Sequence, residues 1–253
     1  CGKDRIHPST DGHLVMAYLF LKAQGLAGKP VADIRIDGAG KKVTRSDNCR
    51  VSDLSVSSDN LTFTYEAKSL PYPIDTSYYD NEKHTQADAL SVISFMDEMN
   101  YEGLSVSGLS DGYYGLTIGG EFIGRFTARE LERGINMALL QNTPQYKQAM
   151  KIRQMNEERW LKERKMREFY WVEYNLMRKT GMLWACDEAA VDTLRKYRPH
   201  DIFLQWNGDL WLQYMHKGIR EDCVNEQQDL VNQIYEQNKP IPLRIEIKKF
   251  TDL

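Results

Sequence analysis

The chain has 253 residues, which is enough to bury one large hydrophobic core or two modest ones. Its 42% apolar and 27% charged residues, with a mean hydropathy of −0.57, are typical of a globular protein. A net charge of −3 gives no electrostatic reason to expect nucleic acid or an anionic membrane as a partner. The longest apolar run, residues 14–21, is about half as long as a membrane-spanning helix, so no membrane span is expected.

The four cysteines are scattered along the chain and show no metal-ligand spacing and no disulfide framework; they are Cys1, Cys49, Cys186 and Cys223. We therefore expect no metal and no cofactor. The cysteine pattern does not indicate the cellular compartment, and export by a bacterium to the periplasm or the outside is one option.

The first predicted element is a helix over residues 8–26. Pro8 and then Ser9 or Thr10 are helix-start signals, and Gly25 is a stop signal. Residues 30–126 then change to period-two alternation, as in half-buried strands. Gly119-Gly120 between two such segments predicts a two-residue hairpin, and residues 85–99 are long enough to hold a short helix.

From residue 127 onward the pattern is mainly helical. Thr127 and Glu130 form a capping box, and Thr143-Pro144 opens a long helix that could extend to residue 179. Two more helices are predicted over residues 187–197 and 217–238, and one strand over residues 241–247. We expect the tryptophans of this region to pack in its core, because each ring buries a large apolar area.

Residues with catalytic chemistry lie at the front of the chain, where Asp4, His7 and Pro8 are followed by Gly12-His13 and an apolar helix. A serine esterase needs a neutral imidazole to take the proton from its nucleophilic hydroxyl. It also needs a carboxylate on the other ring nitrogen, which fixes the tautomer and stabilises the imidazolium. An Asp three residues before a His can supply both groups from one loop.

The extended pattern, residues 4–17, resembles the closing block of the SGNH (GDSL) hydrolase family, which ends its α/β/α domain with D-x-x-H-P, G-H and an apolar helix. The resemblance implies that His7 is the general base and Asp4 its orienting carboxylate. Residues up to about 152 are also similar to the portion that follows the hydrolase domain in some bacterial SGNH proteins.

The rest of the family's machinery has no counterpart here. Its nucleophile lies in an early G-D-S block, and only three residues precede Asp4, so the nucleophile is unknown and is expected outside the chain. Ser110, between Gly108 and Gly112, is better interpreted as a turn residue because no helix follows it. Asp4, His7 and His13 could instead be metal ligands, but no fourth ligand has suitable spacing.

The sequence thus predicts an α+β chain in three parts. Residues 1–28 are the C-terminal end of an SGNH hydrolase domain with its final helix, residues 29–126 are a β-rich segment, and residues 127–253 are a mainly helical subdomain. The leading hypothesis is that the chain is part of an SGNH-type serine hydrolase acting on an ester substrate, with an acylated carbohydrate as the expected class. The alternative is a non-catalytic binding or interaction module that retains an esterase remnant.

The apolar helix at residues 9–24 implies a partner. Leu14, Val15, Tyr18, Leu19 and Phe20 are too many for a helix whose apolar stripe covers only part of its circumference. We therefore expect this helix to contact either a missing N-terminal hydrolase segment or a second copy in a homo-oligomer.

Overall fold

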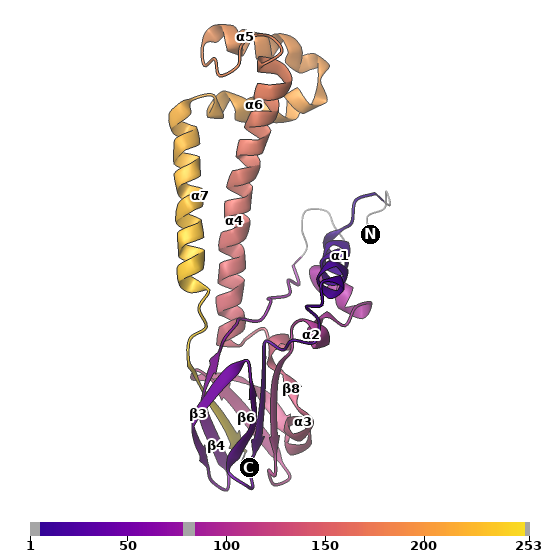
Figure 1. Ribbon diagram of the computed structural model, residues 1–253, viewed down its shortest axis with the longest axis vertical. Helices are drawn as coiled ribbons and strands as arrows, with labels where there is room; N and C mark the ends of the chain where they lie inside the picture. The colour runs from indigo at the N-terminus through magenta and orange to yellow at the C-terminus, as the bar shows by residue number, and fades with distance from the viewer. Residues whose placement is uncertain (1–5, 78–83, 251–253) are drawn as a thin grey trace. The chain divides into compact units, whose positions relative to one another are not determined.

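The computed structural model describes residues 6–77 and 84–250, which form two compact units (Figure 1). The first unit comprises the chain up to Lys151 together with the chain from Asn238 onward, and the second is Ile152–Gln237. Two β-sheets and a helical segment make the chain an α+β protein, as the sequence predicts. Asp4 lies outside the described residues, as do Cys1, Tyr78 and Tyr79.

The first helix, α1, covers Thr10–Ala23, with Ser9 as its N-cap and Gly25 in the left-handed conformation after its end. It packs on the 3₁₀ helix η1 (Gln86–Ser91) and the short helix α2 (Phe95–Glu98). The contact combines a small apolar cluster with a polar clamp, in which the Tyr18 hydroxyl and the Lys22 ammonium donate to the Glu98 carboxylate at 2.8 and 3.0 Å. The hydrogen bond from Lys22, reinforced by that from Tyr18, lowers the pKa of Glu98.

One four-stranded sheet has the order β2-β1-β5-β8. Its strands are β1 (Ala32–Asp37), β2 (Lys42–Asp47), β5 (Glu102–Ser107) and β8 (Ile135–Asn136). Strands β1 and β5 are parallel and the other pairs are antiparallel. Because β1 and β5 are central, they are the most buried strands of this sheet.

The other sheet has five strands in the order β3-β4-β9-β6-β7, all antiparallel. Its strands are β3 (Cys49–Val56), β4 (Asn60–Ala67), β6 (Tyr113–Ile118), β7 (Glu121–Thr127) and β9 (Leu243–Lys249). The predicted hairpin at Gly119-Gly120 joins β6 to β7, and both glycines have positive φ (59° and 85°), which a primed two-residue turn requires. Strand β9 is shifted two residues from its predicted position.

The main core of the first unit lies between the two sheets. Alternate residues of β4 are buried, so Leu61, Phe63 and Tyr65 face Ile34 and Leu104 of the other sheet. The helix α3 (Ala128–Arg133) covers β5, and its predicted capping box between Thr127 and Glu130 is present. After the 3₁₀ turn η2 (Met137–Leu139), the chain enters the long helix.

The second unit is built from helices joined by turns. Helix α4 (Pro144–Val172) begins in the first unit, and its later part pairs with α7 (Lys217–Gln237) through an ion pair of 2.7 Å between Lys162 and Glu226 (Figure 1). Between them come α5 (Glu188–Tyr197), the 3₁₀ turn η4 (Arg198–His200) and α6 (Ile202–Tyr214). Helix α4 ends in a π-helical turn, η3 (Glu173–Met177), instead of continuing regularly to residue 179.

A buried carboxylate lies in the core of this unit. Glu173 is 1% exposed, and its two oxygens accept hydrogen bonds from the Trp211 indole N–H at 2.8 Å and from the Trp184 backbone N–H at 2.9 Å. Trp184 has a φ of 65°, which is rare for a residue with a large side chain. Glu173 therefore links the core tryptophan Trp211 to a strained surface residue.

The expectation that the tryptophans pack in the core is wrong for three of them. Trp211 is fully buried, but Trp160, Trp184 and Trp206 are exposed by 46%, 47% and 66%. The sequence pattern does not separate the buried tryptophan from the three exposed ones, because the helical unit is too small to enclose all of its aromatic rings. In the described part of the chain, no helix combines the length and apolar character that crossing a membrane requires.

Candidate functional site

The turn before α1 contains the predicted base. His7 lies in a bend of the chain with an exposed side chain, and Pro8 leads into the N-cap residue Ser9. The buried Ser9 hydroxyl donates to the Asp11 carboxylate, which also accepts from the Gly12 N–H at 2.8 Å. Burial acts to raise the pKa of Asp11, but these two hydrogen bonds outweigh it and lower the pKa. The chain after His7 is thus fixed to the first turn of α1.

Because Asp4 lies outside the described residues, the proposed contact between its carboxylate and the His7 ring is not described. His13, one turn further on, is exposed. The two histidines therefore occupy different positions on the same segment, and only His7 lies in the turn before α1.

A cavity of about 690 Å³ lies beside this turn. Pro8, Asp11 and Met16 line one side of it, and residues in η1 and on either side of it, among them His84 and Val92, line the other. Its walls are mostly apolar, and at its polar end the His84 Nδ1 lies 3.9 Å from a carboxylate oxygen of Asp11 and 3.9 Å from one of Asp88. A cavity of this size accommodates a small organic molecule.

In the sequence, His84 is an isolated histidine, which by itself indicates a surface or packing residue. The structure instead places it opposite α1, about seventy residues away in the chain, where it lines the cavity. No local signal could have shown this, because only the docking of η1 on α1 brings the two segments together.

Ser110 does not form a second site. It lies in the loop between β5 and β6, where its hydroxyl contacts the Tyr114 hydroxyl at 3.1 Å and accepts from the Lys249 ammonium at 2.8 Å. The prediction that it is a turn residue is confirmed. Over residues 6–77 and 84–250, no group of three His, Cys, Asp or Glu side chains is placed to hold a metal ion.

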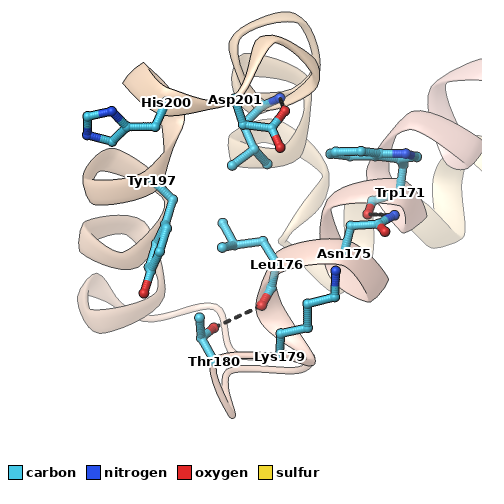
Figure 2. A pocket seen from close by; sticks show the side chains of 9 residues that line it. Trp171, Asn175, Leu176, Lys179, Thr180, Tyr197, His200 and Asp201 are labelled. Carbon is cyan, nitrogen blue, oxygen red and sulfur yellow. Dashed lines mark hydrogen bonds between the residues drawn. The ribbon is translucent and has the colours of Figure 1, made fainter.

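The helical unit holds a separate cavity of about 390 Å³ (Figure 2). Its lining comes from the end of α4 with η3 and the turn that follows, and from the end of α5 with η4 and the start of α6. The lining residues are Trp171, Asn175, Leu176, Lys179, Thr180, Tyr197, His200, Asp201 and Leu204. The sequence predicts no site at these residues. The signal that could have been noticed is the concentration of aromatic residues around the end of a polar helix.

A comparison with protein families gives a match for the second unit. Residues 150–239 match the family model of the diltiazem deacetylase C-terminal helical domain, which corresponds to the second unit. A search of the curated proteins found no match.

A solved structure matches nearly the whole chain. It is described as "BT4096 a gut microbial diltiazem-metabolizing enzyme", and it aligns over 99% of this chain with 41% sequence identity and a TM-score of 0.92. This chain spans 57% of the length of that chain. The α+β fold, with its sheets and its helical unit, is therefore common to the two proteins.

Proposed function

We propose that this chain is the C-terminal part of a deacetylase-type ester hydrolase. The observation that carries the proposal is the 41% identity to a diltiazem-metabolizing enzyme over 99% of the chain. The match of residues 150–239 to a domain named for a deacetylase supports the same class of reaction. The exposed His7 and the cavity beside its turn supply a place for the chemistry.

In this proposal His7 is the general base and Asp4 orients it. The His7 ring takes the proton from a serine hydroxyl as the serine oxygen attacks the ester carbonyl, and it returns that proton to the alcohol that leaves. Water then repeats the sequence on the acyl-enzyme and releases the carboxylic acid. The Asp4 carboxylate holds the imidazole in the correct tautomer and stabilises its protonated form.

The serine and the oxyanion donors are proposed to lie outside these 253 residues. Supporting this is the greater length of the matched enzyme, of which the chain spans 57%. We further propose that the complete enzyme is of the SGNH type, on the pattern of Asp4, His7, Pro8, Gly12 and His13.

The substrate proposed is an acetyl ester. The matched enzyme is named for metabolising diltiazem, and the matched family for removing an acetyl group from it. The resemblance to SGNH hydrolases suggests acylated carbohydrates as the second substrate class. A substrate panel should therefore set diltiazem and 4-nitrophenyl acetate beside an acetylated sugar.

The test uses a longer protein that contains this chain and the coding sequence upstream of it. We expect that protein to release acetate from at least one member of the panel and the 253-residue chain to release none. His7→Ala should lower kcat/KM by about 10³-fold or more, as removing a triad member does, whereas His13→Ala should leave it within a few-fold.

Two results would contradict the proposal. If the 253-residue chain hydrolyses the esters and loses this activity with His7→Ala, the nucleophile lies inside the chain. If the longer protein is folded and inactive on every ester, the chain serves as a binding or interaction module instead.

A further inference from the structure

The cavity in the helical unit is not used by the proposed ester hydrolysis, and its shape indicates a ligand of its own. Trp171 and Tyr197 lie on different sides of the central space, and Leu176 points into it between them (Figure 2). The Trp171 ring also packs on Phe203, with the two ring centroids 5.2 Å apart. Leu176 and Leu204 are almost fully buried and form the apolar floor. At about 390 Å³ the cavity falls within the range of small-molecule sites.

The backbone that shapes the cavity is irregular. Asn175 and Leu176 belong to the π-helical turn η3, and such turns are rare and occur frequently at functional sites. The turn begins at the buried Glu173, whose carboxylate also holds Trp184 in its strained conformation. Strained backbone persists only where the surrounding structure holds it, so this end of α4 is firmly positioned.

Most polar groups around the cavity already have partners. The Asn175 amide donates to the Trp171 carbonyl at 2.9 Å, and the Thr180 hydroxyl donates to the Leu176 carbonyl at 3.0 Å. The Asp201 carboxylate caps α6 by accepting from the Phe203 N–H at 2.8 Å, so the N-terminal end of that helix offsets its charge.

Lys179 is different. Its side chain is exposed, and in the part of the chain that the structure describes no carboxylate forms an ion pair with it. Figure 2 shows its ammonium directed toward Asn175 at the edge of the cavity. The His200 ring, by contrast, points away from the central space. The cavity therefore combines aromatic and aliphatic walls with the Lys179 ammonium at its edge. A second ammonium, that of Lys196, lies 5.5 Å from the centroid of the Tyr197 ring.

We propose that this cavity binds a flat, apolar anion, such as an aromatic carboxylate. The ligand's ring would lie against Trp171 and Tyr197, and its carboxylate would accept a hydrogen bond from Lys179. The site is separate from the proposed catalytic turn, so its occupation does not depend on ester hydrolysis.

The experiment is a titration of the 253-residue chain with 2-naphthoate, followed through the five tryptophan indole N–H signals in ¹H–¹⁵N NMR spectra. The Trp171 signal, assigned with Trp171→Phe, should shift saturably with a Kd of order 10⁻⁴ to 10⁻³ M, whereas the Trp160 signal should not move. The uncharged analogue 2-naphthamide should bind about fivefold or more weakly.

Lys179→Met should weaken 2-naphthoate by the same factor and leave 2-naphthamide unchanged. Lys165→Met, which removes an exposed lysine from α4 away from the cavity, is the matched control and should bind both compounds as the wild type does. The proposal is overturned if the Trp171 signal does not saturate by about 10 mM, or if the two lysine variants bind 2-naphthoate equally.

Discussion

Glu102 is a carboxylate in a buried environment that disfavours its charged form. It is fully buried between β5, β4 and the start of α4, where its Oε1 accepts from the Tyr65 hydroxyl at 2.8 Å and from the Gln145 amide at 3.3 Å. Its Oε2 and the Gln145 Oε1 have no hydrogen-bond partner among the described residues. Burial raises the pKa of Glu102 to about 7, so a proton on this carboxyl is part of the folded structure at mildly acidic pH.

This shift predicts how stability depends on pH. Between the ordinary pKa of 4.5 and about 7, the unfolded chain has lost the Glu102 proton and the folded chain keeps it. The free energy of unfolding therefore falls as pH rises through this window, by up to about 3 kcal/mol, and levels off above it. Glu102→Gln should remove this part of the pH dependence.

Urea denaturation at pH 5, 7 and 9 measures the effect, with Glu132→Gln, at an exposed glutamate, as the control. If wild type and Glu102→Gln lose stability in parallel between pH 5 and pH 9, Glu102 is ionised in the folded protein.

Glu173 gives a second prediction at this scale. Glu173→Ala leaves the Trp211 indole and the Trp184 backbone N–H without their acceptor, which should lower the free energy of unfolding by about 3 kcal/mol. Glu173→Gln keeps one acceptor and should lose less. Urea unfolding followed by tryptophan fluorescence measures both, and Glu168→Ala on the surface of α4 should change stability by less than about 0.5 kcal/mol. Equal stability of Glu173→Ala and wild type would show that neither bond contributes.

At the scale of single elements, α1 has two apolar faces, and the described residues cover one of them. Leu14 and Tyr18 are buried against η1 and α2, whereas Met16, Leu19 and Phe20, at helical spacing on another face, are exposed by 56–64%. Burying a large apolar side chain contributes about 1.5–3 kcal/mol, so this exposed face favours contact with another surface. The expectation that α1 contacts another segment or a second copy therefore applies only to the face that carries Met16, Leu19 and Phe20.

We therefore predict that the isolated chain self-associates or binds the dye ANS through this face. Leu19→Lys with Phe20→Lys should reduce both effects, and Tyr235→Lys, at an exposed apolar residue on α7, should not. Sedimentation velocity and dye fluorescence measure the outcome. A wild-type chain that is monomeric and does not bind the dye would show that this face needs no cover.

Local signals predicted most elements because the deciding interactions are local. The Thr127 capping box, the two glycines of the hairpin and the alternation in β4 each fix a conformation within a few residues. The sequence does not predict helix α6, because its apolar residues lie on both faces: Leu204 and Trp211 are buried, whereas Phe203 and Trp206 are exposed. Without a polar face there is no helical period to detect, although the N-cap Asp201 was a usable signal.

The candidate sites were less predictable than the elements. The motif identified the turn at His7, but the cavity beside it depends on the distant His84, and the second cavity depends on how α6 returns to the end of α4. Contacts between distant segments set both, and a single sequence does not encode them as a local pattern.

For the whole molecule, the helical unit is an insertion in the β-rich unit. The two points where the chain leaves and returns are adjacent, since the Gln148 amide donates to the Lys239 carbonyl at 2.8 Å. The unit also has its own core, which includes Phe169, Met177 and Trp211. Each unit therefore has the features of an independently folding domain.

We predict that replacing residues 152–237 by a short Gly-Ser linker leaves the β-rich unit folded. Circular dichroism should show loss of most helix with cooperative thermal unfolding retained, and a fragment of residues 150–239 should be helical by itself. If the linker variant unfolds without cooperativity while the fragment stays helical, the β-rich unit needs the helices for its stability.

The central position of β9 has a consequence for biosynthesis. The hairpins β3-β4 and β6-β7 are joined into one sheet only by β9, which follows the entire helical unit in the chain. On the ribosome, the two hairpins emerge before β9 has been synthesised. Translation of the helical unit delays β9 by a time of order ten seconds at ~5–20 residues per second. During that time the nascent chain carries two unpaired strand edges, which are templates for aggregation. Chaperones that shield such edges should matter more for this protein than its final fold would suggest.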